Sequence, residues 1–208
     1  MSTTQPLRPP TINYPADGTV QPVARFLWRP ISAPALPDEV SPHLIGKKIA
    51  LVGGSSTTIR QIARALEENG AHVYHFLPST ENYELAAQTF VQQAQSLDGI
   101  IDLNLDMSFT LEKQSAWEDA FRQTIALLKA VYQDWEDETD SQRLFYTTVT
   151  TSQQPLGGLW AGLAKTIHRE IPNCNVKIID YAPGEHITEQ DAIKAPSSYN
   201  VGEANSPL

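Results

Sequence analysis

From Lys47 onward, short apolar runs alternate with longer segments in which apolar residues recur at helical spacing. This alternation predicts strands joined by helices, and helices of this length favour right-handed crossovers between parallel strands. The strands are predicted at residues 48–52, 71–77, 99–103, 144–149 and 176–179, with helices starting near Ile59, Ser79, Lys113 and Gly157. The sequence therefore predicts a Rossmann-like three-layer α/β sandwich, with a mostly parallel sheet of about five strands.

The length of 208 residues suits one domain with flexible ends. Residues 1–22 are rich in proline, which is typical of an extended linker. An additional N-terminal strand is predicted at residues 25–28, and Pro30 ends it. The Rossmann-like domain is expected to span residues 23–183, and residues 184–208 are expected to be a polar tail or linker.

The charge balance excludes two classes of partner. The net charge is -9 and the pI is about 4.9, whereas binding to a nucleic acid or to an anionic membrane needs basic surface. No apolar run approaches the ~18 residues of a membrane span, and the N-terminus lacks the apolar core of a signal peptide. Cys174 is the single cysteine, so no internal disulfide can form. We therefore expect a cytoplasmic protein.

The segment from Ile49 to Ile59 predicts a strand, a turn and the start of a helix, which is where a dinucleotide-binding domain carries its glycine fingerprint. Counted from Gly53, the third and sixth positions of a G-x-G-x-x-G motif hold Ser55 and Thr58. The looser G-x-x-x-G-x-G spacing fails as well, because its later positions hold Thr57 and Ile59. The fingerprint is therefore missing.

The small residues of this turn allow two interpretations. The favoured one is a plain turn followed by a Ser or Thr helix cap. The alternative is an anion site at the helix N-terminus, where free N–H groups and the helix dipole attract negative charge. An atypical NADPH site here would use Gly53, Gly54, Ser55 and Thr57. Residues 74–77, at the end of the second strand, offer no acid to bind a ribose hydroxyl.

Other candidate sites are weaker. Asp102, Asp106 and Lys165 invite comparison with a receiver domain, but the acids that such a site needs after its first strand are absent. His72 and His75 are three apart on a strand and point to opposite faces, so no shared metal site is predicted.

Gly158 and Gly162 are four apart and are expected to lie on one face of the last long helix. Because glycine weakens a helix, we expect this face to approach the sheet or a partner closely. The simpler alternative assigns residues 157–158 to the turn before the helix.

Several segments in order resemble the structural subdomain of the ketoreductase region in modular polyketide synthases, a short-chain dehydrogenase/reductase-like family. The resemblance covers about residues 23–183. The matching segments are Arg25–Pro30, Leu51–Gly54, Asp98–Leu103, Gly158–Thr166, His168–Pro172 and Val176–Asp180.

The resemblance implies a non-catalytic half that supports a separate catalytic half. That half binds NADPH and reduces a β-keto thioester on an acyl carrier protein, in secondary metabolite biosynthesis. Short-chain reductases use a Tyr with a Lys four residues later. If Lys165 were that Lys, the Tyr position would be Ala161, and neither Tyr146 nor Tyr181 has a Lys at this spacing.

The resemblance thus implies no catalytic, cofactor-binding or metal-binding residues in this chain, with NADPH held by the partner half. The expected partners are the ketoreductase catalytic subdomain and other synthase domains, and neither nucleic acid nor membrane. Two other functions stay open: an atypical NADPH-dependent short-chain-type reductase, and a receiver-like or flavodoxin-like binding module.

Overall fold

A computed structural model divides the chain into two units, Met1–Ala35 and Leu36–Leu208. All residues that the structure describes lie in the second unit. They are residues 44–79, 82–107, 109, 112–137, 143–149, 156–171, 174–180 and 187–194. The predicted linker at residues 1–22 and the predicted strand at residues 25–28 lie outside these ranges.

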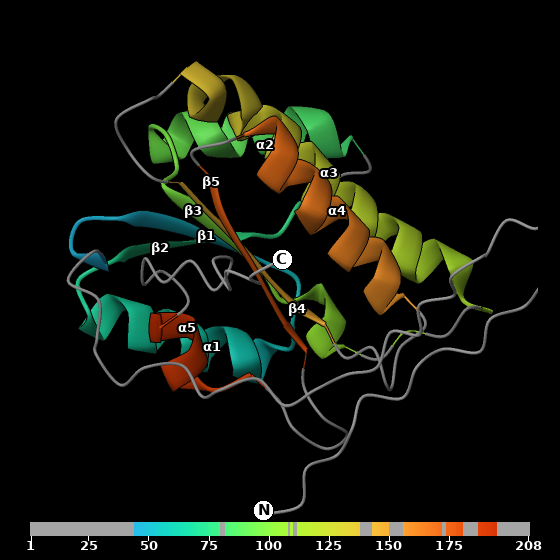
Figure 1. The fold of residues 1–208 in the computed structure, drawn as a ribbon, viewed down its shortest axis with the longest axis horizontal. Coiled ribbons are helices and arrows are strands. Elements are labelled where there is room, and N and C mark those ends of the chain that lie inside the picture. Colours follow the sequence, from blue (N-terminus) through green and yellow to red (C-terminus); the bar gives the residue numbers. More distant parts are fainter. Residues whose placement is uncertain are drawn as a thin grey trace, which may run out of the picture. The chain divides into compact units, whose positions relative to one another are not determined.

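The described residues form a five-stranded sheet in the order β2-β1-β3-β4-β5, and all neighbouring strands are parallel (Figure 1). The strands are β1 (Lys48–Val52), β2 (His72–Phe76), β3 (Gly99–Asp102), β4 (Arg143–Val149) and β5 (Cys174–Asp180). In the register of the central strands, Ala50 lies between Tyr74 and Ile100. The predicted parallel sheet is confirmed.

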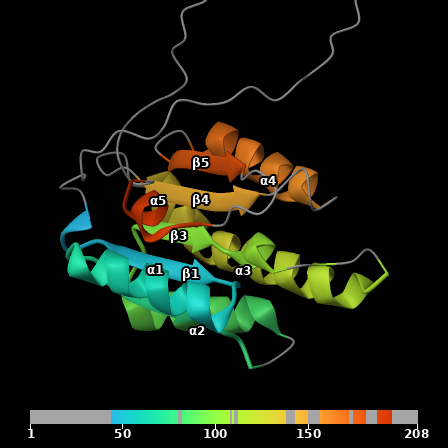
Figure 2. The same ribbon diagram turned by 90° about the horizontal axis from the view of Figure 1, so that it is seen from below.

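Helices cover both faces of the sheet, which gives the expected three layers (Figures 1 and 2). One face carries α1 (Ser56–Glu68) and α5 (Glu189–Lys194), and the other carries α2 (Tyr83–Ala94), α3 (Gln114–Asp137) and α4 (Gly157–Glu170). A short 3-10 helix, η2 (Asn104–Asp106), follows β3. None of the helices in these ranges is long and apolar enough to cross a membrane.

Successive residues of β1 point to opposite faces of the sheet and contribute to two separate hydrophobic cores. Ile49 and Leu51 pack with the α1 side, whereas Ala50 and Val52 pack with the α2–α4 side, and all four are buried. A strand whose residues are buried on both faces reads as a continuous apolar run, which is why this strand could be recognised from its sequence.

The predicted end of the domain at residue 183 is too early. Glu189–Lys194 form α5, and its residues Ala192 and Ile193 are buried in the core beside α1. A short helix therefore lies within the predicted polar tail, and the packed domain extends at least to Ile193.

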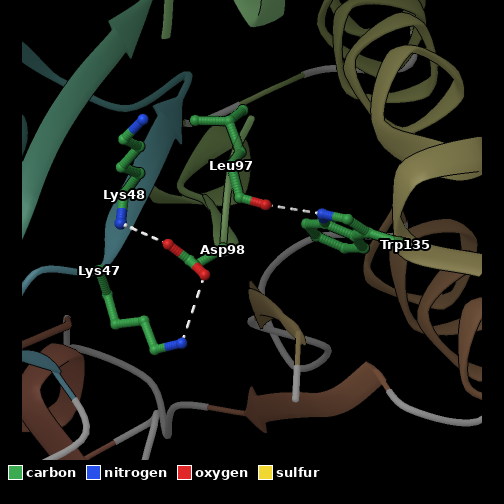
Figure 3. Close-up of polar contacts among 5 residues, drawn as sticks. All are labelled: Lys47, Lys48, Leu97, Asp98 and Trp135. Carbon is green, nitrogen blue, oxygen red and sulfur yellow. Dashed lines mark hydrogen bonds and ion pairs between the residues drawn. The ribbon is translucent and has the colours of Figure 1, made fainter. Parts of the chain in front are cut away.

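The amino end of β3 is held by polar contacts with its neighbours (Figure 3). The carboxylate of Asp98 accepts hydrogen bonds from the backbone N–H of Lys48 at 2.9 Å and from Nζ of Lys47 at 3.3 Å. The indole Nε1 of the buried Trp135 donates to the carbonyl of Leu97 at 2.8 Å. These bonds connect the start of β3 to β1 and to α3.

The predicted close approach of Gly158 and Gly162 to the sheet is wrong. Both glycines are exposed, and a Cβ added at either one would meet nothing within 4 Å. The buried face of α4 contains Trp160, Ala164 and Ile167, so position 162 falls on the solvent side.

Gly162→Ala should therefore stabilise the protein by up to about 1 kcal/mol, because alanine is the better helix former and has room. Urea unfolding of the two proteins measures the difference. Gly158→Ala, in the first turn, is the matched comparison and should gain less. A loss of stability in Gly162→Ala would mean that this face of α4 is covered.

Candidate functional site

In a doubly wound sheet, ligands bind beyond the carboxyl ends of the strands, where the strand order reverses. In this sheet that point lies between β1 and β3, because the helices that follow these strands, α1 and α3, lie on opposite faces. The turn Gly53–Gly54 follows β1, and the segment Leu103–Asp106 follows β3. These two turns are the candidate site.

Both glycines of the first turn have left-handed backbones, with φ of 70° at Gly53 and 87° at Gly54. A Cβ on Gly53 would lie 2.8 Å from the Cα of Asn104, and one on Gly54 would lie 2.9 Å from the Cβ of Leu103. The space that these glycines leave is therefore used by the turn after β3. In a dinucleotide-binding domain, the corresponding space lets the backbone approach a pyrophosphate.

The helix that follows is capped as the favoured interpretation expects. Ser55 is the N-cap of α1, and its Oγ accepts the backbone N–H of Thr58 at 3.1 Å. The hydroxyl of Thr58 donates to Oδ2 of Asp106 at 2.6 Å. Since each hydroxyl has one hydrogen, Ser55 donates in the 2.8 Å contact between the two hydroxyls. The first turn of α1 thus faces a carboxylate from the turn after β3.

This arrangement does not fit a dinucleotide. A pyrophosphate at the N-terminus of α1 would meet the like charge of Asp106, and the space beside Gly53 is already taken by Asn104. After β2, the exposed Leu77 stands where an acid would bind a ribose hydroxyl. Of the remaining residues of the atypical NADPH site, Ser55 is the helix cap and Thr57 is exposed.

A second polar cluster lies deeper, at the carboxyl end of β3. Asp102 is fully buried, and its carboxylate accepts three hydrogen bonds. The donors are the backbone N–H of Asn104 at 2.9 Å, Oγ1 of Thr124 at 2.7 Å and the indole Nε1 of Trp160 at 2.8 Å. The amide of Asn104 donates to Oγ1 of Thr124 at 3.0 Å, which leaves the Thr124 hydroxyl hydrogen for Asp102. One carboxylate therefore joins β3, α3 and α4.

Burial raises the pKa of Asp102, and the hydrogen bonds from Thr124, Asn104 and Trp160 partly oppose this. Among the described residues, no cation forms an ion pair with it. A raised pKa means that the folded protein holds the proton more tightly than the unfolded chain.

Stability should therefore fall as the pH rises from the unfolded pKa of Asp102 through its folded pKa, and this contribution should be constant above it. In Asp102→Asn this pH dependence should vanish, although the variant loses an acceptor and is less stable at every pH. Urea unfolding between about pH 4 and 8 tests this. Asp134→Asn, at an exposed position of α3, is the control. Parallel stability curves for Asp102→Asn and the unsubstituted protein would contradict the prediction.

Aromatic side chains fill the space just beyond this carboxylate. Trp160 is fully buried, stacks on Phe109 with ring centroids 6.5 Å apart, and meets the edge of Phe121 at 5.0 Å. The same cluster also contains Leu105, Ala120 and Leu156, with Trp117 and Ile178 packed against it. Trp160, Phe109 and Phe121 form an aromatic plug, and the indole N–H of Trp160 connects it to the buried carboxylate of Asp102.

The other predicted site residues are not brought together. Lys165 is exposed on α4, whereas Asp102 is buried and Asp106 is bonded to Thr58, so the receiver-like set does not form. A fully buried carboxylate is also out of reach of a phosphate donor. Across the described ranges, no group of three or more His, Cys, Asp or Glu side chains could hold a metal ion.

The search of protein families and the search of curated proteins found no match. Among solved structures, NADH-dependent reductase A1-R′ complexed with NAD is similar at 13% identity and a TM-score of 0.52, over 74% of this chain and 88% of that chain. The two chains share a Rossmann-like fold.

Two further solved structures match with lower TM-scores. The first ketoreductase of the tylosin PKS matches at 16% identity and a TM-score of 0.49, over 72% of this chain. This chain spans only 33% of that ketoreductase. A Sinorhizobium meliloti protein assigned to the short-chain dehydrogenases/reductases matches at 15% identity and a TM-score of 0.44, over 71% of this chain and 73% of that chain.

From the sequence, Asp102 and Asp106 were considered only for a receiver-like site, which was disfavoured, and Asn104, Thr124 and Trp160 were missed. The sequence did contain one sign of the buried polar cluster. Thr124 comes three residues after Phe121 and four before Leu128, so it lies among apolar residues on one face of the long helix. A threonine on such a face indicates a buried polar partner.

Proposed function

We propose that this chain is a non-catalytic structural subdomain that supports the ketoreductase of a polyketide synthase. A partner half would carry out the NADPH-dependent reduction of a β-ketoacyl group on an acyl carrier protein. The Rossmann-like fold supports this proposal, as does the ordered set of segments that resembles the ketoreductase structural half.

The observation that carries the proposal is the plug of Trp160, Phe109 and Phe121 at the carboxyl end of β3. A reductase needs space there for nicotinamide and substrate, together with a hydroxyl that protonates the carbonyl oxygen. In this chain the indole fills the space and its N–H is used by Asp102. If Lys165 on α4 held the place of the catalytic Lys, the Tyr position would be Ala161, which has no hydroxyl, and Lys165 is exposed.

A second candidate is a flavodoxin-like binding module, because the strand order 2-1-3-4-5 is also that of flavodoxin-like folds. Such folds bind FMN at the β1/β3 switch point, where this chain places Asn104 against Gly53. An FMN titration followed by flavin fluorescence separates the two proposals, since a scaffold should leave the fluorescence unchanged.

The main test combines the chain with the catalytic half of a polyketide synthase ketoreductase. We expect the chain alone to neither bind NADPH at submillimolar concentration nor oxidise it with a β-ketoacyl thioester. Adding the chain to the reductase half should raise the rate of NADPH oxidation. A micromolar dissociation constant of NADPH for the chain alone, about -8 kcal/mol, measured by calorimetry, would contradict the scaffold proposal.

A further inference from the structure

We propose that Asp106 is an internal counter-anion that occupies the position of a nucleotide phosphate at the N-terminus of α1. The consequence is that the crevice between β1 and β3 is completed by the chain itself and does not need a bound nucleotide. This inference rests on the geometry of the crevice and is independent of the proposed ketoreductase role.

The N-terminus of α1 would be stabilised by an anion that its own first turn does not supply. The N-terminus of an α-helix has free N–H groups and a partial positive charge, and a nearby anion stabilises it. The first turn of α1 contains no acidic residue of its own. The carboxylate comes instead from Asp106, 48 residues away from Thr58, through the 2.6 Å hydrogen bond of the Thr58 hydroxyl.

Backbone and side-chain contacts hold in place the turn that carries Asp106. The backbone N–H of Leu103 donates to the carbonyl of Val52 at 2.8 Å. Asn104 is buried against Gly53 and donates to Thr124 at 3.0 Å. Moving Asp106 away from α1 would disturb these buried contacts, so its carboxylate is held at the helix end.

The carboxylate of Asp106 and a nucleotide phosphate would compete for the same helix end. Dinucleotide-binding folds place a pyrophosphate at this helix end, where the N–H groups point at it. A carboxylate that is already there would repel the phosphate and offsets the partial positive charge of the helix end in its place. Removing the negative charge, while keeping the shape of the side chain, should therefore make the site responsive to phosphate.

Asp106→Asn removes the charge and keeps the shape of the side chain, with one oxygen that can accept from Thr58 and an NH2 group in place of the other. We expect its melting temperature to fall by about 2–4 °C. Inorganic pyrophosphate should recover part of this loss, with sodium chloride at equal ionic strength as the salt control. The unsubstituted protein should not respond to pyrophosphate beyond that control.

Two further variants sharpen the test. Thr58→Val removes the hydrogen bond but keeps the carboxylate, so it should lose stability without responding to pyrophosphate. Asp134→Asn makes the same charge change at an exposed position of α3 and should change neither quantity.

Three outcomes would overturn the proposal. They are an unchanged melting temperature in Asp106→Asn, a loss that pyrophosphate does not reverse, and equal pyrophosphate responses in Asp106→Asn and the unsubstituted protein. The assay uses the chain alone and measures stability, so its failure is distinguishable from failure of the ketoreductase assay.

Discussion

Replacing Trp160 with alanine should lower the free energy of unfolding by about 3–5 kcal/mol. The indole is fully buried against Phe109 and Phe121, so its removal leaves a cavity in the aromatic plug. It also removes a hydrogen bond from the buried carboxylate of Asp102. Urea unfolding, followed by circular dichroism, measures the loss.

Trp160→Phe separates the two contributions, because it keeps an aromatic ring and loses the N–H donor. We expect it to cost about 1–3 kcal/mol. Leu159→Ala is the matched control, since this side chain is on the same helix and is 38% exposed, and it should change stability by less than about 0.5 kcal/mol. If Trp160→Ala behaved like Leu159→Ala, the plug would not exist in solution.

Gly53→Ala should cost about 2–5 kcal/mol, the second large effect. Part of the cost is the left-handed backbone, with φ of 70°, which disfavours any side chain. The rest is overpacking, because the new Cβ would lie 2.8 Å from the Cα of Asn104. Backbone atoms move less readily than a flexible side chain, so the turn after β3 would have to shift. Thermal and urea unfolding both measure the effect.

Gly46→Ala is the control for this prediction. Gly46 has nearly the same φ, 73°, but a Cβ there would meet nothing within 4 Å. It should therefore show the backbone cost alone, about 1–2 kcal/mol. Equal losses in the two variants would mean that Asn104 does not pack on Gly53.

The fold could be predicted because its signals are local. The nearly continuous apolar run of β1 and the helical spacing of Ile62 and Leu66 are both set by neighbours within a few residues. The parallel arrangement then followed from the helical connections. The short helix α5 was missed because Ala192 and Ile193, which are buried, are adjacent and show no helical period.

The candidate site could not be predicted in the same way. The bond between Thr58 and Asp106 joins residues 48 apart, and the bond between Asp102 and Trp160 joins residues 58 apart. The sequence did show that the glycine fingerprint was missing. It could not show that Asn104 fills the space beside Gly53, since that depends on where the turn after β3 is placed by the sheet.

The two ends of β3 differ in how much of their polar support is exposed to solvent. At the amino end, the bond from Trp135 to Leu97 is buried, but the ion pair of Asp98 with Lys47 is partly exposed, so dissolved salt weakens it. At the carboxyl end, the bonds to Asp102 are buried and are not screened. Local unfolding should therefore start at the amino end of β3, and its amide hydrogens should exchange there first as the ionic strength rises.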